Sequence, residues 1–171
     1  MPGGSTHVLH RSVTDVGITS LGGQSLNDVI ELKSGKRYRL CQMHTVIINN
    51  ATANGEVSEY LAASTTVVTQ DISISASTST SDVLGVGIAN AAFLETDSTN
   101  TYYGWFQISG HHAAALTDTA TVAGCGLRPD PATDGKLIVI ATGADTRSHS
   151  QAFALTDDVA GVTPVLCHFP A

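Results

Sequence analysis

The chain has 171 residues, of which 42% are hydrophobic and only 13% are charged, and its net charge at pH 7 is −7. This length suits one domain, or one domain with an arm. The acidic balance argues against nucleic acid and against an anionic membrane as partners, because both bind clustered cations. A low share of charged residues favours a subunit of an assembly, with a stable secreted β domain as the alternative.

The cysteines indicate the compartment. Cys41, Cys125 and Cys167 are widely spaced, and an odd number gives no disulfide framework and no zinc-site spacing. We expect reduced, mostly buried thiols, which suits synthesis in a cytoplasm. Residues 1–5 lack the apolar core of a signal peptide, and the nearly apolar run 83–94 is too short to cross a bilayer. A soluble protein without an export signal is expected.

Residues 1–30 differ from the rest of the chain. They are punctuated by glycines and contain few large apolar side chains, which predicts an extended N-terminal arm. A short strand is expected at 7–10, and the helical spacing of apolar residues within 24–32 allows one or two helical turns. Residues 31–171 are then the β-rich domain.

From residue 36 onward, apolar and polar residues alternate with the period of a β-strand. Asn54-Gly55 and residues 129–135 are turn signals. The expected strands are 38–48, 65–76, 82–94, 101–109, 113–116, 137–140, 152–156 and 162–169. We expect 113–116 to pair with 101–109, and 137–140 to be a central strand. Strands recurring about every 8–12 residues predict an all-β, mostly antiparallel sandwich or barrel, jelly-roll-like.

Four of the nine aromatic residues fall within five positions, at Tyr102, Tyr103, Trp105 and Phe106. On a strand, Tyr103 and Trp105 share one face, and Tyr102 and Phe106 share the other. A strand that is aromatic on both faces needs cover on both. We interpret it as core on one face and contact with another subunit on the other. The alternative is a platform that stacks on sugar rings.

No motif in the sequence indicates catalysis or a cofactor. There is no Gly-x-Ser-x-Gly elbow, and the carboxylates are too dispersed to place a catalytic pair. His111 and His112 are adjacent, so on a strand they point in opposite directions and cannot easily chelate one metal ion. Gly85 and Gly87 lack the third glycine of a dinucleotide site and indicate a bulge or a close backbone approach. We expect no enzyme, no metal and no cofactor, with a hydrolase as a remote third class.

Half of the eight basic residues lie within seven positions, at Lys33, Lys36, Arg37 and Arg39. A solvated turn and strand start explains them, and the sharper hypothesis is a docking patch for an acidic partner surface.

Several pieces of the sequence occur in an informative order. Tyr103-Gly104-Trp105-Phe106-Gln107 is followed by the apolar residues 113–116, the glycine-rich residues 123–127 and the turn at 133–137. From about residue 80 to 142 this resembles small β-rich head proteins of tailed bacteriophages, the capsid decoration or cement proteins. The resemblance provides no catalytic residue.

The resemblance implies a structural virion protein, made in the host cytoplasm and bound to the outer surface of an icosahedral capsid. There it would stabilise the shell by bridging subunits of the major capsid protein, as a homotrimer or, as second choice, a dimer. Candidate docking residues are Val8, Leu9, Val13, Lys33, Lys36, Arg37 and Arg39. The alternative function is a carbohydrate- or receptor-binding β module on the virion surface that uses exposed tyrosine and tryptophan.

Overall fold

A computed structural model describes residues 12–44, 53–62, 64–71, 75, 85–94, 96–118, 121–140 and 150–170. Within these residues the chain is all-β, with ten strands and no helix. The strands are β1 (Val29–Glu31), β2 (Arg37–Met43), β3 (Val57–Tyr60), β4 (Val67–Thr69), β5 (Gly85–Ala89), β6 (Tyr103–Leu116), β7 (Gly126–Pro129), β8 (Leu137–Val139), β9 (Ala152–Ala154) and β10 (Val162–His168).

Five of the strands close into a barrel. They pair in the order β2–β4–β3–β5–β6, and an additional pairing of β6 with β2 completes the ring. Only β2 and β4 run parallel within this ring. Within the described residues, closure gives each of these five strands a partner on both sides. The predicted all-β, mostly antiparallel fold is confirmed, and it takes the form of a barrel. The strand order does not establish a jelly roll or an extended N-terminal arm.

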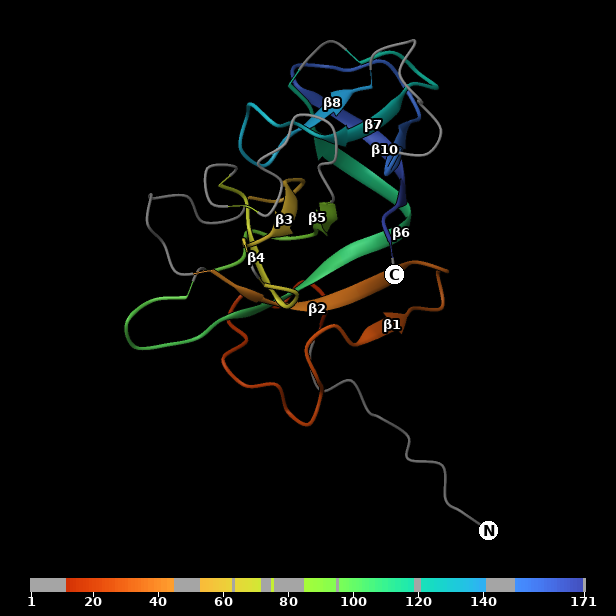
Figure 1. The fold of residues 1–171 in the computed structure, drawn as a ribbon. Helices are drawn as coiled ribbons and strands as arrows, with labels where there is room; N and C mark the ends of the chain where they lie inside the picture. Colours follow the sequence, from red (N-terminus) through yellow and green to blue (C-terminus); the bar gives the residue numbers. More distant parts are fainter. Residues whose placement is uncertain are drawn as a thin grey trace.

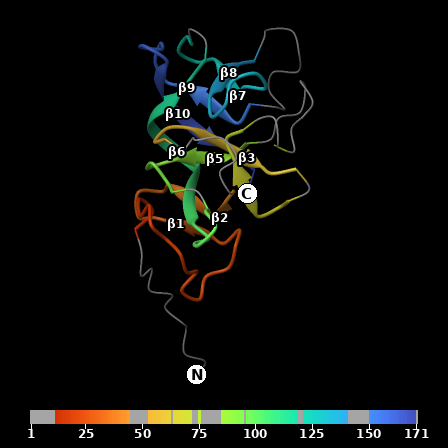
Figure 2. The same ribbon diagram turned by 90° about the vertical axis from the view of Figure 1, so that its left-hand side faces the viewer.

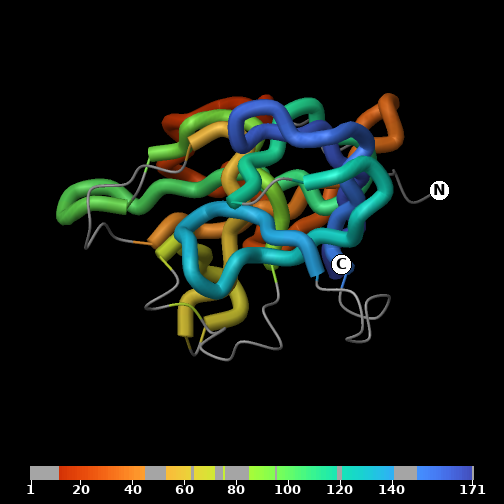
Figure 3. The backbone as a smooth tube through the Cα atoms, turned by 90° about the horizontal axis from the view of Figure 1, so that it is seen from above, coloured from red at the N-terminus to blue at the C-terminus, as the bar shows by residue number. Residues whose placement is uncertain are grey.

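The remaining strands form a second sheet that shares β6 with the barrel. From β6 the order continues through β10, β9, β7 and β8. A parallel bridge between Thr117 and Leu137 brings β8 back to the end of β6, so this sheet also curls toward a ring. Figures 1 and 2 show it above the barrel, and Figure 3 shows the blue C-terminal strands beside the teal and cyan ones.

The long strand β6 serves both sheets because it bends at its middle (Figure 1). Its first half pairs with β2 and β5, and its second half pairs with β10. Gly110 adopts φ +89° at the junction, a region that L side chains rarely enter. The Gln107 side-chain amide is buried there and donates to the carbonyls of Ser109 and Gly110, at 3.3 and 3.1 Å. The expectation that 113–116 would pair back onto 101–109 is therefore wrong, because the glycine bends one strand instead of starting a hairpin.

The core has three parts, each in a different place. The barrel interior contains residues from all five of its strands, with Phe93 packed against Phe106, their ring centroids 5.3 Å apart. A second cluster lies between the barrel and the second sheet and includes Ile88, Ile108, Leu127 and Val165. A third lies outside the barrel, where residues from the N-terminal segment cover Trp105.

Glycines in β5 and β6 stand where another group comes very close. A Cβ at Gly104 would lie 3.0 Å from the Phe93 ring, and one at Gly87 would lie 2.9 Å from the carbonyl oxygen of Gln107. The β3–β5 register also shifts opposite Gly85 and Gly87. The expected close backbone approach is confirmed at Gly87 and the expected bulge is confirmed in the register, whereas the atoms closest to a Cβ at Gly85 belong to side chains.

Other expectations need correction or lie outside the described residues. Residues 24–32 contain turns and the strand β1, which pairs with β2, so the prediction of helical turns there is wrong. Pairing with a neighbouring strand overrides the helical spacing of the few apolar residues in this segment. Strand β8 stands at the end of the strand order rather than at its centre. The turns at Asn54-Gly55 and 129–135 are confirmed, and the strand expected at 7–10 lies outside the described residues.

Replacing Gly110 tests the bend in β6. We expect Gly110→Ala to lower the free energy of unfolding by about 1–2 kcal/mol, because alanine pays this cost in the left-handed region. Gly17→Ala is the matched control, since Gly17 has no positive φ and no atom within 4 Å of an added Cβ. Urea denaturation of both variants measures the difference, and equal stabilities would contradict the role of Gly110.

Candidate functional site

The aromatic stretch lies at the start of β6, and its two faces enter different clusters. Tyr103 and Trp105 face the outer cluster, whereas Tyr102 and Phe106 face the barrel interior. The predicted alternation is confirmed. Trp105 and Phe106 are both completely buried by the chain itself, and Tyr102 and Tyr103 are half-buried. Burial of the Trp105 face thus needs no second subunit, and contact of the two tyrosines with a neighbour stays a prediction.

The cover over Trp105 comes from the segment expected to be an arm. Ile18 is 2% exposed and forms a β-bridge with Tyr103, whose amide donates to the Ile18 carbonyl at 2.9 Å. The candidate docking residue Val13 is half-buried against the same cluster, together with Leu21, Ile30 and Leu32. Val13 thus offers only part of its side chain to a partner. The docking candidates Val8 and Leu9 lie outside the described residues.

Tryptophan fluorescence tests this cover, because Trp105 is the only tryptophan. We expect acrylamide to quench the Trp105 emission of the native protein poorly. In urea, quenching should rise to the value of a solvent-exposed tryptophan. Ile18→Ala should lower stability by about 2–5 kcal/mol through the cavity it leaves. The control Val16→Ala, at a 39% exposed position, should have little effect. Strong quenching of native wild type would show that Trp105 is open to solvent.

The basic residues that cluster in the sequence separate in the structure. Lys33 is exposed beside the turn between β1 and β2, and Lys36 and Arg37 are half-buried. Arg39 is only 6% exposed, because its side chain turns into a pocket between β2, β3 and the C-terminal segment. Arg39 therefore cannot belong to a surface docking patch, whereas Lys33, Lys36 and Arg37 stay candidates.

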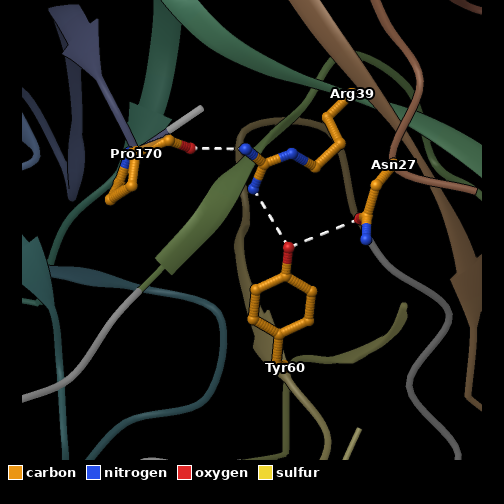
Figure 4. A pocket seen from close by; sticks show the side chains of 4 residues that line it. All are labelled: Asn27, Arg39, Tyr60 and Pro170. Atoms are coloured by element: carbon orange, nitrogen blue, oxygen red, sulfur yellow. Dashed lines mark hydrogen bonds between the residues drawn. The ribbon is translucent and has the colours of Figure 1, made fainter. Parts of the chain in front are cut away.

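The pocket holding Arg39 is an open cavity of about 290 Å³ lined by Asn27, Arg39, Tyr60 and Pro170 (Figure 4). The Arg39 guanidinium donates through Nη1 to the Tyr60 hydroxyl at 3.1 Å and through Nη2 to the Pro170 carbonyl at 2.6 Å. The Tyr60 hydroxyl donates to Asn27 Oδ1 at 3.4 Å, and Asn27 Nδ2 donates to the Thr65 carbonyl at 2.8 Å. Sequence reasoning missed this site, because its residues come from four separate segments.

The outer side of the second sheet carries exposed apolar residues. Phe153 of β9 and Leu166 of β10 are paired across the two strands, and Leu155 follows two residues after Phe153. Their exposed fractions are 39%, 46% and 45%. The alternate residues of the same strands, including Ala152, Ala154 and Val165, are buried. We call Phe153, Leu155 and Leu166 the β9–β10 face.

Two more exposed valines lie in turns beside the β9–β10 face. Val122 is 58% exposed, and its turn is held near β9 by a bond from the Gly124 amide to the Ala154 carbonyl. Val159 is 76% exposed in the turn between β9 and β10. Five of the eight exposed large apolar residues found in the described part of the chain thus gather at this end of the molecule.

The described histidines and cysteines lie apart from one another or are buried. His111 is exposed and His112 is buried, in accordance with their opposite directions on β6. The described residues contain no group of three or more His, Cys, Asp or Glu that could hold a metal ion. Burial raises the pKa of the Cys41 and Cys167 thiols to about 12, which keeps both protonated and unreactive. In the described part of the chain, no helix is long and apolar enough to cross a membrane.

His112 gives the fold a pH dependence. Burial lowers its pKa to about 4, against a hydrogen bond with the Ala89 backbone that raises it, and the charges of Lys36 and His111 lower it further. Between the unfolded pKa of about 6.5 and pH 4, only the unfolded state takes up the proton. The contribution of neutral His112 to the free energy of unfolding is therefore complete above pH 6.5 and is lost as the pH falls toward 4.

We expect His112→Gln to remove this contribution. As the pH falls from 6.5 to 4, the unfolding equilibrium constant of the wild type should rise relative to that of His112→Gln by up to about tenfold per pH unit. Urea unfolding of both proteins at pH 7, 6 and 5 measures the difference, and carboxylates affect both proteins equally. Parallel pH profiles would contradict the lowered pKa.

No family model matches the chain, and no curated protein sequence matches it. Among solved structures, the chain is similar to the head fibre gp8.5 N base of bacteriophage phi29, with 9% identity and a TM-score of 0.46. The similarity covers 76% of this chain and 92% of that chain. A likeness at this level carries no argument about the function or partners of this chain.

Proposed function

We propose that the chain is a structural, non-enzymatic protein of a tailed-phage virion that binds the outer surface of the capsid and bridges major capsid protein subunits. The observation that carries the proposal is the β9–β10 face, where Phe153, Leu155 and Leu166 are 39–46% exposed and lie next to one another. The order of sequence pieces from Tyr103 to Leu137 supports the choice of a capsid as the partner.

The β9–β10 face has the chemistry of a protein-binding surface. Full burial of an exposed side chain of this size contributes about 1.5–3 kcal/mol, and because these three are 39–46% exposed, covering each contributes less than half of that. The strands that flank the face pair Phe153 with Gly126 and Leu166 with His111, so no Lys, Arg, Asp or Glu stands directly across from either side chain. Repetition of the contact over many lattice sites makes modest individual affinity sufficient.

Other parts of the proposal concern surfaces beyond this face. The exposed Lys33 and the half-buried Lys36 and Arg37 could pair with acidic groups of the capsid, and Val8 and Leu9 would add apolar contacts. A homotrimer, or a dimer, would place several β9–β10 faces on one capsid site. The sugar-binding alternative loses Trp105 as a stacking platform, because its ring is completely buried.

Polar substitution on the face tests the proposal. We expect Leu166→Gln to bind capsids of the virus that encodes the chain at least tenfold more weakly than wild type, as measured by co-sedimentation. Leu94→Gln is the matched control, because Leu94 is 43% exposed but lies in another part of the chain. Both variants should unfold at the wild-type urea concentration, since both side chains are already exposed.

Three outcomes overturn parts of the proposal. Wild type that does not bind these capsids removes the function. Leu166→Gln binding as tightly as Leu94→Gln removes the β9–β10 face as the docking surface. Loss of a stable oligomer in Leu166→Gln, measured by sedimentation without capsids, assigns the face to self-association instead.

A further inference from the structure

Arg39 is a cation in an unusual position for this chain. Its side chain is 6% exposed, yet within the described residues its guanidinium bonds to two neutral groups, the Tyr60 hydroxyl and the Pro170 carbonyl. No ion pair joins Arg39 to a carboxylate of the part of the chain that the structure describes. A buried cation without a counter-charge costs several kcal/mol, and buried charges are normally paired.

The pocket beside Arg39 has room and donors for a counter-ion. The two hydrogen bonds of the guanidinium use two of its five N–H groups, and a guanidinium presents the rest in a fork that matches a carboxylate. The cavity of about 290 Å³ borders these atoms and is open to solvent (Figure 4). A small anion can therefore reach the charge without unfolding the chain.

Tyr60 and Asn27 add further donors. The bond from the Tyr60 hydroxyl to Asn27 Oδ1 is 3.4 Å, much longer than the usual 2.7–2.8 Å, so the hydroxyl proton can turn to a better acceptor. Burial raises the pKa of Tyr60, while the charge of Arg39 opposes this shift, so the hydroxyl stays protonated at neutral pH. Asn27 Nδ2 carries two hydrogens and donates one to the Thr65 carbonyl.

We propose that this pocket binds one carboxylate group, with the Arg39 guanidinium as its counter-charge and the Tyr60 hydroxyl as a second donor. A single positive charge beside the Pro170 carbonyl oxygen favours a monovalent carboxylate over a divalent phosphate or sulfate. The carboxylate comes from a small acid, such as an acidic sugar, or from an acidic side chain of a protein. The pocket and the β9–β10 face use different residues, although Pro170 of the pocket follows β10, which carries Leu166.

Acetate is the simplest probe of this site. We expect saturable binding of sodium acetate to wild type, measured by NMR titration at constant ionic strength with sodium chloride as the balance. Asn27→Asp should weaken acetate binding at least tenfold, because it places a competing carboxylate beside Arg39. Aspartate tolerates the φ of +66° found at position 27, so this variant should fold. Tyr60→Phe should weaken binding several-fold by removing a donor.

The outcomes separate the proposal from its rivals. No saturable acetate binding to wild type, or equal binding to wild type and Asn27→Asp, overturns the site. Tighter binding of sulfate than of acetate overturns the choice of a carboxylate. Urea unfolding of each variant, with Lys33→Gln as a surface-charge control, shows that any loss of binding does not come from loss of the fold.

Two further probes identify the source of the carboxylate. Glucuronate represents an acidic sugar, and N-acetyl-glutamate amide represents an acidic side chain. Binding of either at least as tightly as acetate supports the proposal and names the source. If acetate binds and neither of the two larger probes does, acetate is an adventitious ion only, and the proposal of a biological carboxylate ligand is overturned. Unchanged capsid co-sedimentation of Asn27→Asp would show that the pocket and the docking face act separately.

Discussion

The bend in β6 is the constraint on which both sheets depend. Gln107 donates its side-chain amide to the carbonyls of Ser109 and Gly110, and Gly110 takes the positive φ that turns the strand. A straight strand of 14 residues could not close the barrel with β2 and also pair with β10. The barrel interior and the cluster under the second sheet therefore meet at this junction, and the β9–β10 face is positioned by it.

Much of this arrangement can be predicted from local sequence, because one short stretch contains several of its parts. The alternation of Tyr103, Trp105 and Phe106 assigns each ring to a face, and the structure fills both faces. Gly104 makes room for the Phe93 ring, which no local pattern could reveal, since Phe93 is eleven residues away in the sequence. Periodicity predicts that a strand exists and which way its side chains point, but not which neighbour covers it.

The site residues were harder to predict for the same reason. Lys33 and Arg39 are neighbours in sequence, yet one is exposed and the other is buried with groups from β3 and from residue 170. The glycine-rich residues 1–30 predict an extended arm, but the apolar residues of the described part of this segment, led by Ile18, cover Trp105. Long-range pairing determines both outcomes, and local sequence patterns contain only short-range information.

A low-charge β scaffold with a buried tryptophan and one uncovered apolar face is well suited to a passive structural role on a large assembly. The measurement that tests this account most directly is electron cryo-microscopy of the intact virus particle. The account predicts regularly spaced density on the outer shell that fits the two-sheet fold, with Phe153 and Leu166 toward the major capsid protein. Bare outer shells, or density of this chain only inside the particle, would contradict it.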